Sequence, residues 1–426
     1  MKRLSKKNVC ALVAAVLLVS GLAVDQAAAA GVDTGIPILT YHDLTRDPSQ
    51  TDSMTITEER FRLDMEFLSE FGYTPLLTDD LIAIQQGDAA MPEKPVMITF
   101  DDGYLSNYTL AYPILQQTGM KAIISVVAYN MGGTGGFSVR QNGQTGENES
   151  GSHLTWEQMR EMVASGLVEI GSHTYNLHNP ELGGVGTPNG VNGVMRKTGE
   201  SFPQYNARVG GDLQRCIDLI IEHTGQQRVN YFAYPFGAYD SWMDRILDEQ
   251  GVPVSVWSNN AKPASVADGL RNLTRYGIKM DQSVSELLRQ TDTATPTRAL
   301  VSVNGIRTNL LAYNIDGSNY VRVRDVAMML KDTVRGFDVQ WNSASGRVEL
   351  RSMTAYEPIG TEDAPLAPGS CTVQSYTEPT VADGAAHMIA SYQMEGSTYY
   401  KLRSLGELCG FGVEWNEADR VIEVTA

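Results

Sequence analysis

Short apolar runs rich in β-branched residues alternate with amphipathic stretches from Pro37 to about Arg289. This alternation is typical of repeated β-α units, in which buried parallel strands are covered by helices. The runs predicted to be strands are Ile38 to Tyr41, Val96 to Phe100, Ala122 to Ala128, Val168 to Gly171, Val229 to Tyr234, Val252 to Trp257 and Leu273 to Ile278. We therefore expect an α/β fold, a (β/α) barrel that is distorted or incomplete.

Helix starts and long loops can be placed within this alternation. Thr57 and Thr155 each precede a stretch with helical spacing of apolar residues, and both are suitable N-caps. Two segments rich in Gly, Asn, Ser and Thr, residues 131–152 and 183–211, are predicted to be surface loops. In a barrel such loops either shape a substrate groove or are tolerated insertions.

Beyond Thr291 the sequence changes character and contains an internal repeat. The segments 317–320 (Gly-Ser-Asn-Tyr) and 339–342 (Val-Gln-Trp-Asn) recur at 396–399 (Gly-Ser-Thr-Tyr) and 413–416 (Val-Glu-Trp-Asn). Each copy is predicted to form a strand, a short helix and a two-stranded hairpin, so we expect a separate, smaller α+β module. The module and its two copies are placed at residues 298–426, about 300–351 and about 371–426.

The first thirty residues have the three-part layout of a secretory signal peptide. Basic residues within positions 2–7 precede an apolar run from Val9 to Val24, and small residues follow at 27–30. Residues 1–30 therefore predict export, and we expect a secreted protein, either extracellular or associated with the cell wall. The apolar run is short for a membrane span, which needs ~20 residues, so no stable transmembrane span is expected after processing.

Charge and cysteine content narrow the partners further. The formal net charge is −17, and phosphate binding requires a basic face, so nucleic acid is not expected as a partner. A neutral or cationic glycan would tolerate such a surface. Cys216, Cys371 and Cys409 match no zinc or redox spacing. Either Cys371 and Cys409 form a disulfide, or all three are unpaired thiols.

The predicted strand that starts at Pro95 ends in Asp101, Asp102 and Gly103. Because side chains alternate across a strand, adjacent acids point in different directions and can do different work. One carboxylate can bind a cation while the other stays free as a base. Taken alone, the pair could equally start a turn and cap the next helix.

A second predicted strand runs into His173 and, five residues later, His178. Two imidazoles and one carboxylate are a common zinc ligand set that leaves a coordination position open for water. The spacing is not the four-residue step of one helix face, so a loop or an irregular turn must bring the two rings together. Taken alone, solvated loop histidines are the simpler interpretation.

A third predicted strand ends in Tyr234, Pro235 and Phe236, which could present a rigid wall and backbone N–H groups to a substrate. By itself this is an ordinary strand-to-turn sequence. However, the acids, the histidines and this segment all fall at the carboxyl ends of predicted strands, where barrel enzymes collect their catalytic residues. Their joint placement favours a single active site.

Together and in this order, the three segments resemble the polysaccharide deacetylases with a NodB homology domain, carbohydrate esterase family 4. Residues 99–103 match the first motif of that family, and residues 173–178 are similar to its second. The resemblance covers roughly residues 31–290, and it implies a NodB-type barrel over that range.

The resemblance also implies a metal-dependent hydrolysis. Asp102, His173 and His178 would bind a divalent metal, usually zinc, with cobalt or another divalent cation as alternatives. The metal would polarise the acetamide carbonyl and lower the pKa of its bound water, and Asp101 would remove the proton as that water attacks. A backbone N–H near Phe236 would help to hold the oxyanion.

Two departures from the family pattern leave the general acid open. The arginine usual in the third motif aligns with Ala233, and the late Leu-x-His motif ends instead in Arg275. The form Tyr-Pro-Phe-Gly at 234–237 and the early segment that ends at His42 are more similar to the branch of poly-N-acetylglucosamine deacetylases. His42 is the candidate that protonates the leaving amine or contacts substrate, and a hydrogen-bonded core histidine is the alternative.

The remaining candidates are substrate contacts. Trp257 either forms an apolar wall for the acetyl methyl group or is simply buried. Arg275 is predicted to bind substrate together with Tyr234, Pro235 and Phe236. Three further histidines fall outside any cluster and are interpreted as structural or solvated: His153, His223 and His387.

The C-terminal repeat resembles the stalk-like module named after the N-terminal domain of copper amine oxidases. It has no constellation of metal ligands, so the resemblance implies no copper, but it does imply attachment to the cell wall or spacing from it. The leading hypothesis is a secreted polysaccharide N-deacetylase, a hydrolase of carbon–nitrogen bonds in peptidoglycan or poly-N-acetylglucosamine. The alternatives are an O-acetyl xylan esterase and an inactive glycan-binding protein.

Overall fold

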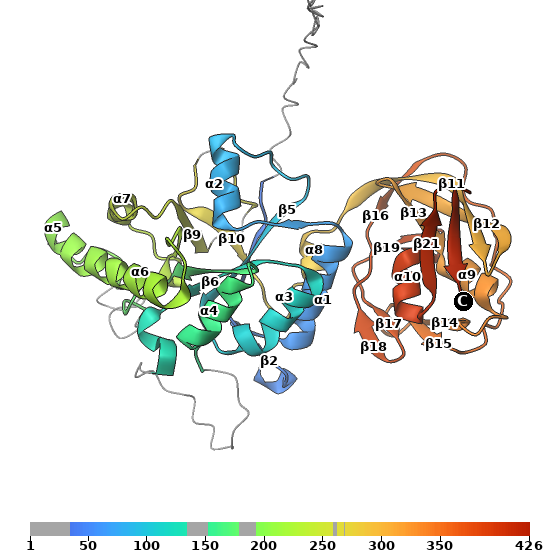
Figure 1. The fold of residues 1–426 in the computed structure, drawn as a ribbon, viewed down its shortest axis with the longest axis horizontal. Helices are drawn as coiled ribbons and strands as arrows, with labels where there is room; N and C mark the ends of the chain where they lie inside the picture. The colour runs from blue at the N-terminus through green and yellow to red at the C-terminus, as the bar shows by residue number, and fades with distance from the viewer. Residues whose placement is uncertain (1–34, 134–151, 179–192, 259–261, 268) are drawn as a thin grey trace, which may run out of the picture. The chain divides into compact units, whose positions relative to one another are not determined.

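The structure is a computed structural model that describes residues 35–133, 152–178, 193–258, 262–267 and 269–426 (Figure 1). The predicted signal peptide, residues 1–30, lies outside these ranges, as does most of the first predicted loop. Within the described residues, none of the helices combines the length and the apolar character that crossing a membrane requires.

Parallel strands close into a barrel. Its strands are β1 (Ile38–Tyr41), β5 (Pro95–Asp102), β6 (Ala122–Val126), β7 (Val168–Ser172), β8 (Tyr231–Ala233), β9 (Val254–Ser258) and β10 (Leu273–Gly277). β1 pairs with β10 on one side and with β5 on the other, so the ring has no open edge, and β4 (Thr74–Pro75) adds a short pairing to the start of β5. Each barrel strand overlaps one of the predicted runs, and the predicted α/β barrel is confirmed.

Helices pack on the outside of these strands (Figure 1). They include α1 (Glu58–Glu70), α3 (Tyr112–Thr118), α4 (Trp156–Ala164), α6 (Gly211–Thr224), α7 (Ser241–Glu249) and α8 (Val284–Leu287). α2 (Thr78–Gln86) differs from them, since its buried Leu81 belongs to the cluster that contains Met97. Thr57 caps α1 by accepting a hydrogen bond from the backbone N–H of Arg60 at 3.1 Å. Thr155 caps α4 in the same way through the N–H of Gln158 at 3.2 Å, so both predicted helix starts are confirmed.

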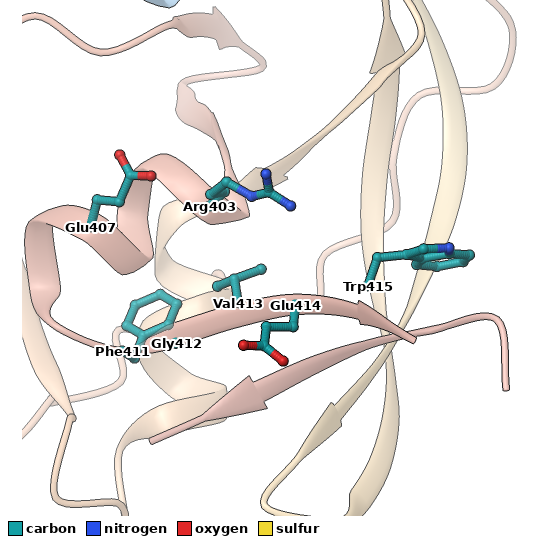
Figure 2. Close-up of a pocket in the computed structure, with 7 residues that line it drawn as sticks. All are labelled: Arg403, Glu407, Phe411, Gly412, Val413, Glu414 and Trp415. Atoms are coloured by element: carbon teal, nitrogen blue, oxygen red, sulfur yellow. The ribbon is translucent and has the colours of Figure 1, made fainter. Parts of the chain in front are cut away.

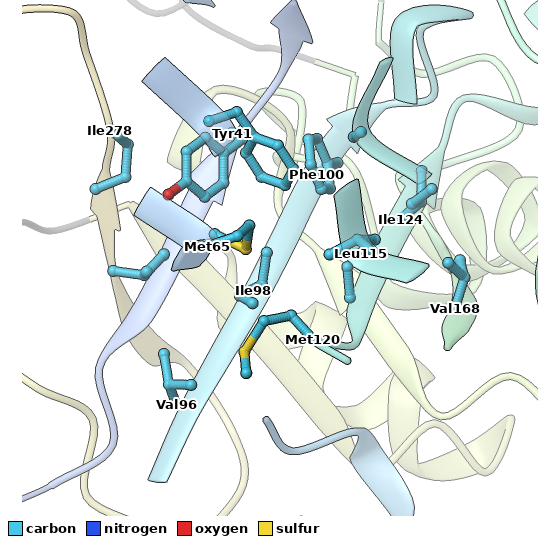
Figure 3. Close-up of a cluster of buried hydrophobic side chains, with 14 of the residues drawn as sticks. Tyr41, Met65, Val96, Ile98, Phe100, Leu115, Met120, Ile124, Val168 and Ile278 are labelled. Carbon is cyan, nitrogen blue, oxygen red and sulfur yellow. The ribbon is translucent and has the colours of Figure 1, made fainter. Parts of the chain in front are cut away.

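Side chains of β5 alternate between two cores. Val96, Ile98 and Phe100 belong to the core between the strands and the helices (Figure 3). Met97 belongs to a second apolar cluster, which fills the lumen of the barrel together with alternate residues of the other strands. The lumen is therefore a packed interior. Later residues of β5 on the same face as Met97 also point into it.

The predicted loop over residues 183–211 is wrong in its second half. α5 (Phe202–Tyr205) and a wider helical turn (Asn206–Gly210) lead directly into α6. Ser201 and Gln204 form a capping box, and the hydroxyl of the buried Tyr205 donates to the carbonyl of Val194 at 2.7 Å. The Gly and Asn content suggested a loop, but cap and burial outweigh these weak local preferences.

The C-terminal region forms mixed sheets with two short helices. In its first copy β13 (Ser318–Arg322) leads to α9 (Val323–Leu330) and the hairpin β14 (Phe337–Asn342) and β15 (Arg347–Ser352). In its second copy β20 (Ser397–Lys401) leads to α10 (Leu402–Cys409) and the hairpin β21 (Gly412–Asn416) and β22 (Val421–Thr425). The other strands of this region are β11 (Thr291–Val303), β12 (Ile306–Ile315), β16 (Cys371–Gln374), β17 (Thr380–Ala382), β18 (Ala385–His387) and β19 (Ser391–Met394). Near the start of the described chain, β2 (Asp43–Thr45) and β3 (Thr55–Thr57) pair with each other.

Both copies thus follow the predicted order of strand, helix and hairpin. The cysteines of this region are free thiols, since Cys371 is exposed and Cys409 is buried without forming a disulfide. The structure therefore selects the second of the two cysteine alternatives.

Candidate active site

The lumen of the barrel carries charged side chains at the carboxyl ends of its strands. On β5 the apolar lumen residue Met97 is followed on the same face by Asp101, and on β10 Leu273 is followed by Arg275. Both charged residues are buried. The alternation of side chains along the two strands therefore directs both Asp101 and Arg275 into the lumen.

Asp101 and Arg275 form a buried bidentate ion pair. Nη1 of Arg275 donates to Oδ1 of Asp101 at 2.8 Å, and Nη2 donates to Oδ2 at 2.7 Å. The hydroxyl of Ser125 on β6 donates a further hydrogen bond to Oδ1 at 2.6 Å. Burial alone would raise the pKa of Asp101, but the opposing charge of Arg275 holds that pKa well below its usual range. Asp101 is therefore an ionised carboxylate in a fixed orientation.

Asp102 leaves the strand in another direction because its backbone turns sharply. Its φ of 74° lies in the left-handed region, which is uncommon for non-glycine residues. Oδ1 of Asp102 lies 3.5 Å from Nε2 of His173 and 3.4 Å from Nε2 of His178. The two adjacent acids thus point to different partners, as the strand period predicts.

The donor set of Asp102, His173 and His178 fits a divalent metal. One ligand atom from each residue lies within 4.8 Å of the other two, so one ion can reach all three. Oδ1 of Asp102 is buried without a hydrogen-bond partner, and a buried carboxylate oxygen that lacks a partner is costly. A cation at this position would satisfy it, and nitrogen and carboxylate donors are the ligands that zinc prefers.

A main-chain hydrogen bond orients His173. Its Nδ1 lies 2.9 Å from the carbonyl oxygen of Ala233, and this contact requires the proton on Nδ1. Nε2 then presents its lone pair toward Asp102, as in metal sites with an outer hydrogen bond to the ligating ring. Burial lowers the pKa of His173 to about 4, so the ring is neutral at neutral pH.

An irregular turn brings the two histidines together, as their spacing requires. Thr174 adopts a left-handed φ of 81° directly after the strand. The backbone N–H groups of Tyr175 and Asn176 donate to the two carboxylate oxygens of Asp212 at 2.8 and 2.9 Å. Asp212 therefore anchors the turn from α6, and the sequence contains no spacing signal that points to this residue.

His42 follows β1 on the face that continues its lumen residues, after Ile38 and Thr40. The side chain is half-buried, and a charge on it would lower the pKa of Asp101. Its carbonyl oxygen accepts a hydrogen bond from Nδ2 of Asn107 at 2.8 Å. The structure therefore places His42 beside Asp101 at the same end of the barrel.

The predicted substrate-binding segment contributes one residue that meets the metal ligands. Phe236 is 46% exposed, and its ring stacks on that of His178 with centroids 4.3 Å apart. Its φ of 57° is left-handed, so the turn holds the ring outward at a conformational cost. Pro235 beside it is buried.

Three other predicted substrate contacts lie elsewhere. Tyr234 is buried in the outer core, and Trp257 packs against that core, because both follow lumen residues by one position and so face outward. Arg275 is 1% exposed, and its terminal nitrogens are bound to Asp101. Arg275 therefore contacts the candidate site through Asp101.

His153 lies closer to the site than its sequence position suggests. An antiparallel bridge joins it to Tyr104, two residues after Asp102, and the two rings stack with centroids 5.4 Å apart. Charges on Asp102 and His178 both act on the pKa of His153, which burial lowers. His153 therefore lies near the proposed metal ligands, and only the fold reveals this proximity.

Comparison with known proteins relates part of the barrel region to one family. Residues 88–255 match the model of the polysaccharide deacetylase family, a range that holds Asp101 and the three metal-ligand candidates. The Bacillus subtilis protein YxkH, provisionally named a polysaccharide deacetylase, is 28% identical over 250 residues, which are 59% of this chain and 74% of that protein.

Two further matches have related names. A poly-β-1,6-N-acetyl-D-glucosamine N-deacetylase of Escherichia coli is 31% identical over 144 residues, which are 34% of this chain and 21% of that enzyme, so the chain spans about a fifth of its length. A solved structure of a de-N-acetylase from Aggregatibacter actinomycetemcomitans is 24% identical, with a TM-score of 0.49, and covers 59% of this chain and 98% of that one. Residues 88–255 are therefore similar to polysaccharide deacetylases, and this similarity supports the prediction of a hydrolase of this class.

Proposed function

We propose that this chain removes N-acetyl groups from a cell-wall or other extracellular glycan, either poly-N-acetylglucosamine or peptidoglycan, by metal-dependent hydrolysis. One observation carries the proposal: Oδ1 of Asp102 is buried without a hydrogen-bond partner and lies between two imidazole nitrogens. The similarity to the Escherichia coli N-deacetylase supports an N-acetylated substrate.

The metal site is the first element of the proposed mechanism. Asp102, His173 and His178 would hold a divalent metal, with zinc as the first candidate and cobalt as the alternative. Such a metal supplies Lewis-acid polarisation of the acetamide carbonyl and lowers the pKa of water. The protein fixes the ligands in advance, since the carbonyl of Ala233 orients one imidazole and Asp212 anchors the turn between the two.

Asp101 is the proposed general base. An ionised carboxylate has about four acceptor positions, and Arg275 and Ser125 occupy those that face the lumen. A position that remains can accept the proton of the attacking water. Arg275 and Ser125 are positioning residues, because they hold this carboxylate ionised and aimed. His42 is proposed to donate a proton to the leaving amine, and Phe236 to form one wall of the substrate site.

Replacing the base while keeping the metal ligands tests this assignment. Asp101→Asn should lower acetate release by about 10²- to 10⁴-fold, the usual contribution of a positioned base, and the metal content should be unchanged. Asp88→Asn, which alters an exposed acid outside the site, is the matched control and should retain wild-type activity. Full activity of Asp101→Asn would show that another group accepts the proton.

A panel of substrates separates the proposal from its alternatives. Acetate release from N-acetylated oligosaccharides, lost with a chelator and restored by zinc or cobalt, is expected. Release from acetylxylan alone would indicate an esterase of O-acetyl groups. Glycan binding with neither bound metal nor acetate release would indicate an inactive binding protein.

The proposal includes export and a division into parts. Residues 1–30 are proposed to be a signal peptide, residues 31–290 the deacetylase domain and residues 298–426 a module that contacts the cell wall. The family match at residues 88–255 falls inside the second part and supports its proposed activity. Processing at the first boundary is checked by sequencing the amino terminus of the exported protein.

A further inference from the structure

The two copies of the C-terminal repeat are related by a local two-fold symmetry. β13 and β20 pair antiparallel, and the register joins Val321 to its own repeat equivalent, Tyr400. On either side of this pair, Tyr320 lies opposite Lys401 and Arg322 lies opposite Tyr399, a reciprocal pattern that only a two-fold relation produces.

The aromatic core repeats this relation. Phe337 begins β14, and its equivalent Phe411 directly precedes β21. Their rings stack with centroids 6.3 Å apart and planes 10° apart. The two helix-and-hairpin units therefore pack on each other through matching residues, and a surface feature of one unit has a counterpart on the other.

Each unit carries a surface cleft built from matching positions. The Trp415 cleft, of about 700 Å³, is lined by Arg403, Glu407, Phe411, Gly412, Val413, Glu414 and Trp415 (Figure 2). The Trp341 cleft, of about 650 Å³, is lined by residues that include Arg324, Val339, Gln340 and Trp341. Arginine, valine, a polar residue and tryptophan thus occur at equivalent places in both clefts.

Both tryptophans are available to a ligand. Trp341 is 47% exposed and Trp415 is 52% exposed. Because side chains alternate along a strand, Trp415 and Val413 share the face of β21 that looks toward Arg403 on α10, and Glu414 points the other way (Figure 2). A large aromatic face kept in water beside charged groups, and repeated in two units, is typical of a binding surface.

The chemistry of the clefts selects the ligand. A flat indole can pack against the apolar face of a sugar ring, while an arginine beside it donates hydrogen bonds to hydroxyl or acetyl oxygens. Each cleft also offers a carboxylate beside its arginine, Glu407 in one cleft and Glu395 in the other. The same carboxylates and the indole face attract an ammonium group, the group that deacetylation exposes on an amino sugar.

We propose that the Trp341 and Trp415 clefts are twin binding sites for an amino-sugar polysaccharide, the partly deacetylated form of the enzyme's own substrate. This proposal rests on the proposed function for the choice of glycan. Two weak sites on one chain raise the apparent affinity for a polymer far more than for a short oligosaccharide, because the second contact is intramolecular. The module then keeps the catalytic domain on a polymer that it has begun to deacetylate.

Sedimentation of the full chain with insoluble chitosan, chitin or cellulose tests this. The wild-type chain should bind chitosan more tightly than chitin and should not bind cellulose. Trp341→Ala and Trp415→Ala should each weaken chitosan binding several-fold, and the double variant should weaken it by more than tenfold. Ile306→Ala, which removes a still more exposed apolar side chain of the module outside both clefts, is the control and should bind like the wild type.

Acetate release from a soluble N-acetylglucosamine pentamer distinguishes this proposal from the proposed function. The double variant should deacetylate the pentamer at the wild-type rate and the insoluble polymer more slowly. Wild-type affinity of the double variant for chitosan would overturn the twin-site proposal and leave the proposed function intact. Polymer binding that depends on both tryptophans, in a chain that never releases acetate, would support the clefts and overturn the proposed function.

Discussion

The barrel lumen and the C-terminal clefts place functional side chains in opposite ways. Arg275 is 1% exposed and donates two hydrogen bonds to a single carboxylate, whereas Trp415 is 52% exposed. A buried ion pair fixes orientation and charge but cannot meet a polymer directly. An exposed indole can meet many sugar rings but holds no reacting atom in place.

This difference suggests a division of labour within one chain. The barrel holds the groups that must keep their protonation states and distances, and it buries them at the ends of its strands. The C-terminal clefts present the same shallow aromatic surface twice. Their apparent affinity for a polymer comes from having two sites on one chain and not from burying the ligand. Substitutions in the lumen should therefore affect the chemical step, and substitutions in the clefts should affect only the capture of long substrates.

The largest expected effect comes from the proposed metal ligand that lacks a hydrogen bond. Asp102→Ala should lower acetate release about a thousandfold or more, because losing several kcal/mol of Lewis-acid stabilisation has that effect. Without metal, the variant should be at least as stable as the metal-free wild type, since a buried carboxylate oxygen without a partner is removed. A large loss of thermal stability in the metal-free variant would show that Asp102 is a structural residue.

The sequence predicts which of these side chains meet at one end of the barrel, because strand period and motif order are local. The runs that become barrel strands, the two helix caps and the divergence of Asp101 from Asp102 all follow from patterns within a few residues. The partner of Asp101 does not, because Arg275 is 174 residues away in the chain and only closure of the ring between β10, β1 and β5 brings it across the lumen.

The same limit explains the other differences. His153 is far from Asp102 along the chain and comes close to it through the bridge to Tyr104. Asp212 likewise contacts the turn between the two histidines from a separate element, α6. Of the two roles predicted for Trp257, packing against the core is the one that the structure favours, since a shift of one position on a strand reverses the face. The hydrogen bond between His173 and Ala233 shows a further limit. The main-chain carbonyl of Ala233 accepts this bond whatever the side chain at that position is, so the residue type does not reveal it.

The next largest effect on activity is expected from weakening the buried ion pair between Asp101 and Arg275, with an exposed ion pair as the comparison. Arg275→Lys keeps the charge but loses the bidentate geometry, so kcat/KM should fall roughly tenfold, an order-of-magnitude figure for a displaced base. The pKa of Asp101 should rise toward its usual value, which moves the acid limb of the kcat/KM profile to higher pH. The profile is measured between pH 3 and 9 at saturating metal.

Arg228→Lys is the matched control for this comparison. Arg228 and Asp79 form an exposed pair at 2.7 Å, with side chains 63% and 65% exposed, and such pairs contribute little. The activity and the pH profile of Arg228→Lys should equal those of the wild type. If Arg275→Lys behaved in the same way, burial of the Asp101 pair would have no role in catalysis.

A smaller effect should appear in the stability of the metal-free protein. Burial lowers the pKa of His173 to about 4 from an ordinary value of about 6.5, so the unfolded chain binds more protons than the folded one between these values. The neutral ring contributes fully above pH ~6.5, and the free energy of unfolding should fall by about 3 kcal/mol as the pH falls to ~4. Urea unfolding of chelator-treated protein across this range measures the slope.

His173→Asn should flatten that slope, whereas His223→Asn, which changes the ring that stacks on Trp156, should leave it in place. An unchanged slope in His173→Asn would mean that other groups cause the acid sensitivity. Chitosan binding through the C-terminal clefts should survive in both variants, which keeps the two regions separable.

The most direct measurement is the crystal structure of the zinc-loaded protein with anomalous data at the zinc edge. The account predicts one strong peak at the end of the barrel, about 2.0–2.2 Å from a carboxylate oxygen of Asp102 and from Nε2 of His173 and of His178, and no peak in the Asp102→Ala variant. A protein that releases acetate with this position empty, or with its metal bound elsewhere, would contradict the assignment of the active site.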